Sequence, residues 1–172
     1  MAHGWTSFYS LIGNAAAGLI GLMFIVVTLT NSRGRPSTLR AIALYLTPTI
    51  LHFGAALAVS AAIEIPTITS PEVAAAIALV ALAGLACCLR SAIGIVRVVN
   101  QPPHWSDFWL YACAPAALYA GLIVAAIGVW QAAGWATMLT ALTLLVLLLL
   151  AVRNAWDTIT WIAASGGGSG DP

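Results

Sequence analysis

The chain has 172 residues, of which 62% are apolar and 6% are charged, and its mean hydropathy is +1.00. Soluble domains carry about 25% charged residues, so this chain has too few polar side chains to cover a surface exposed to water. Six arginines, no lysine and five acids give a net charge of +1, which excludes the concentrated basic surface that nucleic acids require and any strong polybasic patch for anionic lipids.

Five apolar segments are long enough to cross a membrane, since a spanning helix needs about 20 residues. They cover residues 6–30, 41–63, 72–97, 107–130 and 135–161. Only a short QAAG break divides the last two, so a four-span or re-entrant arrangement stays open. We predict an all-α polytopic bundle of five transmembrane helices that forms one domain, residues 1–164. A flexible Gly/Ser tail or linker, residues 165–172, follows it.

The placement of the arginines predicts the orientation, because basic residues are retained on the cytoplasmic side. With five spans, all six arginines fall on one side and Glu64 and Glu72 fall on the other. We therefore predict that the N-terminus lies outside and the C-terminus in the cytoplasm. The tryptophans agree, because all fall near a predicted boundary: Trp5, Trp130 and Trp135 at the outer one, and Trp105, Trp109, Trp156 and Trp161 at the inner one.

Small residues at four-residue spacing allow two helices to approach closely within lipid. The first span carries Gly13, Ala17 and Gly21, and the fourth carries Ala117, Gly121 and Ala125. We expect these two helices to be central. Such packing suits a monomer or a homo-oligomer, but so small a bundle has little room for its own aqueous path, so conduction would require several subunits. The three cysteines lie in apolar runs, where we expect them to serve as small packing residues.

The second span has a polar face formed by Tyr45, Thr49, His52 and, further along, Ser60. At about 1.5 Å per residue, His52 lies near the membrane midplane and Asn14 of the first span lies at a comparable depth. Histidine titrates near neutral pH. Three interpretations stay open: hydrogen bonding between helices, a path for protons, ions or a small polar solute, and haem ligation by His52 with a second ligand from elsewhere.

Two prolines fall inside predicted spans, Pro48 in the second and Pro115 in the fourth. Proline lacks a backbone donor and leaves the carbonyl one turn earlier without its usual partner. We therefore predict a kink at each.

The segment AVRNAWDTITW, residues 151–161, places charged and polar side chains at the predicted cytoplasmic lip. Arg153 and Asp157 are spaced i and i+4 and can pair, although Asp157 could instead bridge to Arg90 of the third span. Asn154 flanks the pair. This cluster either anchors and pairs helices or forms a cytoplasmic mouth or partner site.

The sequence contains none of the common motifs for catalysis, metal binding or phosphate binding. It has no glycine-rich phosphate loop, no H-x-x-x-H or C-x-x-C pair and no pair of carboxylates at one depth within the membrane. We therefore expect no enzyme, no metal site and no cofactor.

Three stretches together resemble a group of small, functionally uncharacterised bacterial integral membrane proteins. They are a W-x-x-F-Y start to the first helix at Trp5, T-P-T-x-x-H-F in the second, which includes Pro48 and His52, and N-A-W-D-x-x-T in the last, which includes Asn154 and Asp157. The resemblance covers most of the chain and implies a bacterial inner-membrane setting, but no catalytic role.

These observations predict a membrane protein whose partners are the lipid bilayer and either further copies of itself or another membrane protein. We expect a homo-oligomeric channel or transport subunit for protons, ions or a small polar solute. The alternative is a non-conducting accessory, structural or regulatory subunit of a membrane complex.

Overall fold

A computed structural model describes the backbone of residues 4–31, 36–98 and 108–166, with side chains described for residues 4–28, 46–94 and 108–160. Its elements are α1 (Thr6–Asn31), α2 (Pro36–Ile63), α3 (Ser70–Val98), the π-helical turn η1 (Trp109–Cys113), α5 (Ala114–Trp130) and α6 (Ala136–Gly166). No strand occurs in the described ranges. Residues 1–3, 32–35, 99–107 and 167–172, which include most of the predicted tail, lie outside them.

Five helices within the described residues are long and apolar enough to cross a membrane. These candidate spans are Thr6–Thr28, Leu46–Ile63, Ser70–Gly94, Trp109–Trp130 and Ala136–Thr160. Each overlaps one predicted segment. The predicted all-α bundle of five spans is confirmed, and the chain is a multi-pass membrane protein. The faint break between the last two spans is a genuine turn between α5 and α6.

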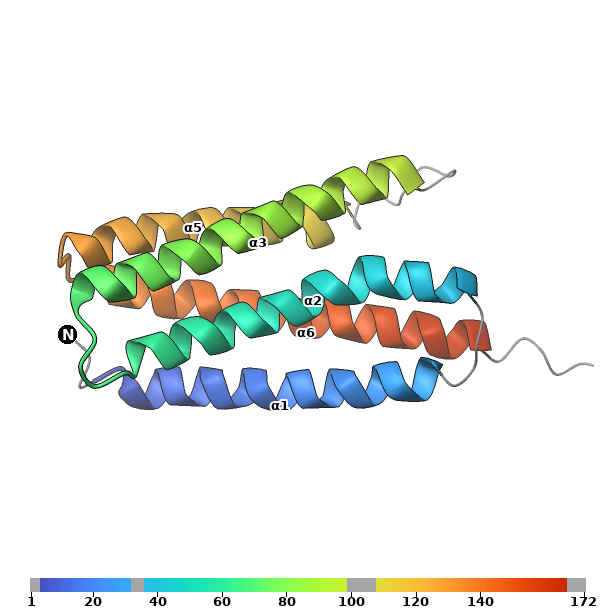
Figure 1. Ribbon diagram of the computed structural model, residues 1–172, viewed down its shortest axis with the longest axis horizontal. Helices are drawn as coiled ribbons and strands as arrows, with labels where there is room; N and C mark the ends of the chain where they lie inside the picture. The colour runs from blue at the N-terminus through green and yellow to red at the C-terminus, as the bar shows by residue number, and fades with distance from the viewer. Residues whose placement is uncertain (1–3, 32–35, 99–107, 167–172) are drawn as a thin grey trace, which may run out of the picture.

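The helices form three layers, with α2 and α6 in the middle, α1 on one side and α3 with α5 on the other (Figure 1). The first helix lies in an outer layer, contacting α2 and α6. The spacing of small residues predicts that α1 and the fourth span are central, and this prediction is wrong. The structure instead places α2 and α6 there, because these two helices contact partners in both outer layers.

The buried face of α1 is not the face that the small residues alone would predict. Large and small side chains alternate on it, at Tyr9, Ile12, Gly13, Ala16 and Met23. This stripe lies beside the one defined by small residues alone. A Cβ placed on Gly13 would lie 3.2 Å from the Cβ of Ser60, so α1 and α2 approach closely at this point.

The other predicted packing residues are divided between buried and exposed positions. Ala17 and Gly21 of α1 and Ala117 of α5 are exposed in the single chain. In contrast, Ala125 of α5 is fully buried, and a Cβ on Gly121 would lie 3.6 Å from the Thr143 hydroxyl of α6.

The turn between α5 and α6 ends the earlier helix with paired backbone hydrogen bonds. The Ala133 N–H donates to the Gly128 carbonyl at 2.9 Å and the Ala132 N–H donates to the Val129 carbonyl at 3.0 Å. This is a Schellman motif, in which Ala132 adopts a left-handed backbone conformation. Its φ is 54°, and it is the only non-glycine residue with positive φ in the part of the chain described.

The alternating direction of the spans gives the bundle two distinct ends. One end, which we call the cavity end because a cavity lies there, carries the start of α1, the α2–α3 loop and the α5–α6 turn, together with Glu64 and Glu72 (Figure 1). The arginine end carries the start of α2, the last turns of α3 and the second half of α6, where Arg40, Arg90, Arg97 and Arg153 occur. The described exposed tryptophans lie toward the two ends, at Trp109, Trp130, Trp135 and Trp156.

Candidate functional site

A buried imidazole and a buried phenol meet in the interior of the bundle. The Nδ1 atom of His52 on α2 lies 2.8 Å from the Tyr119 hydroxyl on α5. The two ring centroids are 5.5 Å apart and the planes are tilted by 49°. His52 is 1% exposed and Tyr119 is fully buried. The pair is therefore sealed from both lipid and water by its own chain.

The depth of these two residues follows from the lengths of their helices. His52 lies 12 residues before Glu64, and Tyr119 lies 11 residues before Trp130, which puts each about 17–18 Å from the cavity end. In a hydrocarbon core of about 30 Å, that position is close to the midplane. The sequence predicts the same position, near the membrane midplane, for His52.

A glycine on α3 creates the space for the phenol ring. A Cβ added to Gly84 would overlap three ring carbons of Tyr119. Gly84 is itself buried. The α3 backbone thus passes close to the Tyr119 ring, and any side chain at position 84 would displace the ring from its place beside His52.

The hydrogen-bonding needs of His52 are only half met. Its Nε2 atom is buried and has no hydrogen-bond partner among the described residues. If the Tyr119 hydroxyl donates to Nδ1, the neutral ring carries its proton on Nε2, and this N–H has no acceptor. The opposite tautomer leaves Nε2 as an acceptor without a donor. In both cases one buried polar nitrogen in the middle of the bundle lacks a hydrogen-bond partner among the described residues.

Comparison with known proteins adds no further information about this site. The chain matches no family model, no curated protein and no solved structure. Any functional argument therefore depends on the residues themselves.

The predicted polar face of α2 is buried but does not form one column. Thr49, His52 and Ser60 are all at most 2% exposed. However, His52 faces Tyr119 of α5, whereas Ser60 lies against Gly13 of α1. The Ser60 hydroxyl is a second buried polar atom without a hydrogen-bond partner in the described chain.

Asn14 does not join His52. It lies on the exposed face of α1, while His52 is in the core. The two differ in face, because α1 turns Gly13 toward α2 and the next residue points about 100° away. They also differ in depth, since Gly13 lies against Ser60, which is about 12 Å along α2 from His52, so the predicted common depth is wrong. The side chain of Tyr45 lies outside the described residues.

Asn154 is almost fully buried, at 1% exposed, and joins α6 to the turn η1. Its amide nitrogen donates to the Leu110 carbonyl at 3.1 Å, and the Tyr111 hydroxyl donates to the Asn154 carbonyl at 3.1 Å. Pro115 explains why the Leu110 carbonyl is available. The Ala114 N–H is directed to the Trp109 carbonyl, and Pro115, next in the π-helical pattern, has no N–H to offer.

The two prolines therefore have different local consequences. Pro115 follows a π-helical turn at the start of α5, and such turns are recognised causes of helix bending. Pro48 lies within α2, which continues helically on both sides of it.

The charged residues of the predicted lip pair within their own helix. Arg153 and Asp157 form an ion pair of 2.9 Å, with side chains 47% and 42% exposed. This is the i,i+4 pairing expected from the sequence. Arg153 also reaches the Asn154 side-chain oxygen at 3.4 Å. Arg90, the alternative partner, is exposed on α3.

No three His, Cys, Asp or Glu side chains within the described ranges lie close enough together to hold a metal ion. The described cysteines, Cys87, Cys88 and Cys113, are free. The chemistry available at the buried site is therefore that of an imidazole and a phenol, which exchange protons and hydrogen bonds.

Two partners of the site were missed by sequence reasoning. Tyr119 is the only tyrosine deep within the fourth span, and a hydroxyl in hydrocarbon requires a partner. Counting its depth from Trp130 would have placed it level with His52. No comparable signal identifies Gly84, because glycine is frequent in membrane helices and its role depends on which helix lies opposite.

Proposed function

We propose that this protein is a transport subunit that handles protons at the His52–Tyr119 pair. The observation that carries the proposal is a histidine at membrane depth, buried by its own chain. One of its nitrogens is bonded to a phenol and the other has no hydrogen-bond partner among the described residues. Ionisable groups are costly at this depth, so their presence marks a functional site by default.

Proton transfer suits the packing better than passage of a larger ion. The polar side chains of α2 point toward different helices and are enclosed by apolar residues. A proton needs only a series of hydrogen-bonding groups or a brief rearrangement, whereas a hydrated ion needs an open pore. Histidine is suited to this task because each of its two ring nitrogens can bind or release a proton.

Assembly of several copies is part of the proposal. Asn14 is exposed on α1 beside Gly18 and Gly21, and space is open around a Cβ placed on either glycine. An amide that faces lipid lacks hydrogen-bond partners, and small neighbours permit a second helix to approach. We place the complex in a bacterial inner membrane with the arginine end in the cytoplasm, which the motif resemblance and the arginine placement support.

Proton flux into vesicles tests the proposal. Purified protein is reconstituted into liposomes that contain a pH-sensitive dye, and a potassium diffusion potential drives proton entry. We expect flux above that of protein-free vesicles. His52→Asn places an amide near the position of Nδ1 and can still bond Tyr119, but it cannot titrate, so flux should disappear while the fold persists.

Tyr119→Phe should reduce the flux, and Gly54→Ala provides the control. Gly54 lies two residues from His52 and has open space around its Cβ position. Equal flux in wild type and His52→Asn would refute the role of the imidazole.

A second candidate function is a non-conducting accessory subunit, and the exposed Asn14 face of α1 favours it. Absence of flux in the wild-type vesicles would overturn the transport proposal. Loss of a stable assembly in Asn14→Leu, measured as particle size in detergent, would then point to the accessory role.

A further inference from the structure

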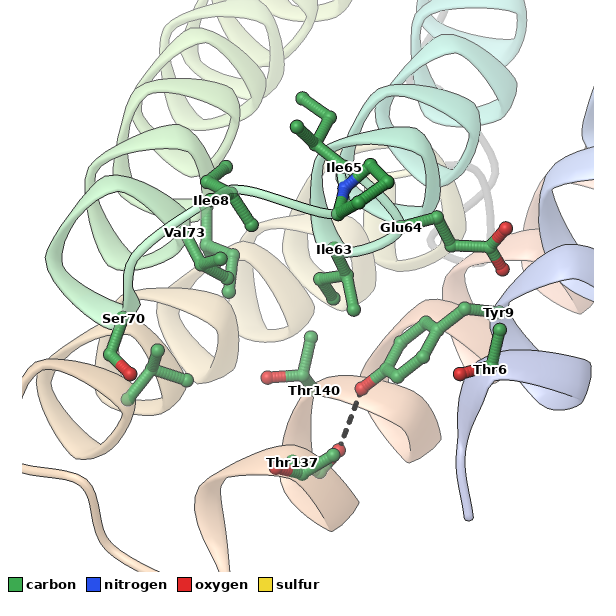
Figure 2. A pocket seen from close by; sticks show the side chains of 13 residues that line it. Thr6, Tyr9, Ile63, Glu64, Ile65, Ile68, Ser70, Val73, Thr137 and Thr140 are labelled. Carbon is green, nitrogen blue, oxygen red and sulfur yellow. Dashed lines mark hydrogen bonds between the residues drawn. The ribbon is translucent and has the colours of Figure 1, made fainter. Parts of the chain in front are cut away.

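A cavity of about 310 Å³ lies at the cavity end of the bundle, where α1, α2, α3, α5 and α6 all contribute to its wall (Figure 2). Its volume falls at the lower limit of small-molecule sites, which span about 300–1,000 Å³. Apolar side chains such as Ile63, Val73, Ile77 and Val129 form much of the lining. The cavity is separate from the His52–Tyr119 pair, because His52 lies about 18 Å along α2 from Glu64.

The hydroxyl groups of the wall offer lone pairs to a ligand. The Tyr9 hydroxyl donates its hydrogen to the Thr137 carbonyl at 2.9 Å, and the Thr140 hydroxyl donates to the Ala136 carbonyl at 2.9 Å. Once its hydrogen is used, a hydroxyl can only accept. None of the described side chains that line the cavity carries an N–H group. A ligand that supplies donors therefore matches the Tyr9 and Thr140 hydroxyl oxygens.

The charge at the rim is negative, and none of the arginines whose side chains the structure describes lies opposite it. Glu64 lines the cavity, and its carboxylate is turned toward α1 (Figure 2), where it accepts a hydrogen bond of 2.6 Å from Ser10. The described arginines lie at the other end. Arg90 is 20 residues along α3 from Ser70, and Arg153 is 17 residues along α6 from Ala136, so each is about 25–30 Å distant along its helix.

We propose that this cavity binds a small organic cation, a protonated amine with a short apolar group. The carboxylate of Glu64 at the rim attracts the ammonium, and the Tyr9 and Thr140 hydroxyl oxygens of the wall offer it further acceptors. The apolar group enters among Ile63, Val73 and Ile77. The cavity thus contributes a recognition site that goes beyond the proposed proton handling and does not depend on it.

Equilibrium binding to the protein in lipid nanodiscs tests this assignment. The probes are n-butylammonium, the neutral 1-butanol and the anionic pentanoate, measured by calorimetry against nanodiscs without protein. We expect saturable binding of the ammonium alone. Along a series of n-alkylammonium ions, each added CH₂ should raise the affinity about fourfold until the cavity is filled.

Matched variants separate the rim charge from general electrostatics. Glu64→Gln should weaken n-butylammonium binding at least about tenfold, which corresponds to loss of one charge-assisted contact. Asp157→Asn makes the same change in net charge at the opposite end and should leave the affinity unchanged. Val73→Phe fills the cavity and should abolish the gain from longer alkyl chains.

Several outcomes would overturn the assignment. These are equal binding of 1-butanol, binding that Glu64→Gln does not weaken, or ammonium uptake no greater than that of empty nanodiscs. Because no probe requires proton flux, the result is independent of the vesicle experiment: a variant at His52 that stops flux should still bind the amine.

Discussion

Substitution of Gly84 by alanine provides the sharpest test of how the buried pair is held. The added methyl group would overlap the Tyr119 ring, which would have to retreat by more than about 1 Å to reach ordinary carbon–carbon separation. The hydroxyl now lies 2.8 Å from His52 Nδ1. A shift of that size takes it beyond hydrogen-bond distance, which ends at about 3.2 Å.

The expected cost combines two effects. Inserting a methyl group into a well-packed core costs about 1–3 kcal/mol. Leaving a buried hydroxyl and imidazole without their partners costs about 1–3 kcal/mol more. We therefore expect Gly84→Ala to lower the free energy of unfolding by about 2–6 kcal/mol. Reversible unfolding in mixed micelles with increasing SDS, followed by circular dichroism, measures this difference.

A matched glycine and a double mutant make the reasoning refutable. Gly54→Ala lies in open space and should be neutral or stabilise α2 by about 0.5–1 kcal/mol, since alanine favours helix. In a Tyr119→Leu background the methyl group at position 84 no longer meets a ring, so most of its cost should vanish. An unchanged stability of Gly84→Ala, or the same cost in both backgrounds, would refute the proposed contact.

Three further substitutions test other parts of the structure by the same unfolding measurement. Asn154→Leu removes the donor to the part-buried Leu110 carbonyl and should destabilise by about 1–2 kcal/mol; a smaller effect than that of exposed Thr160→Val would contradict the stabilising role of the hydrogen bond between α6 and η1. Asp157→Asn breaks an ion pair whose partners are 47% and 42% exposed, so the loss should stay below about 0.5 kcal/mol. Ala132→Gly relieves a φ of 54° and should stabilise by about 0.5–1 kcal/mol; destabilisation would show that the turn is held otherwise.

The number of spans was predictable because it depends on a property that each segment carries by itself. A run of apolar residues of sufficient length specifies a spanning helix whatever its neighbours are. The pairing of Arg153 with Asp157 was predictable for a similar reason, since residues four apart on one helix are always adjacent. Both inferences needed no knowledge of how the helices are arranged.

The helix partners were harder to predict, because several faces of α1 satisfy the same rule. Small residues occur at Gly13, Ala17 and Gly21, yet only Gly13 is buried. Shape complementarity between large and small side chains decides among such faces, and this depends on the opposing helix. The expected meeting of Asn14 with His52 failed because neither the rotation of α1 about its axis nor its register against α2 is determined by the sequence. The structure sets Gly13 against Ser60, about 12 Å along α2 from His52.

The contrast between Asn154 and His52 indicates where function resides in this bundle. Both are buried polar residues on central helices, each 1% exposed. Asn154 engages its amide nitrogen and its backbone carbonyl with neighbours on η1, so its environment is explained by structure alone. At His52 the same bundle leaves Nε2 without a partner among the described residues. Selection for packing alone would favour an apolar residue of similar size at this position, because such a residue leaves no unsatisfied nitrogen. If His52→Leu with Tyr119→Phe unfolds at higher SDS than wild type, the pair reduces the stability of its own helix bundle, which is expected of a site kept for function and not for folding.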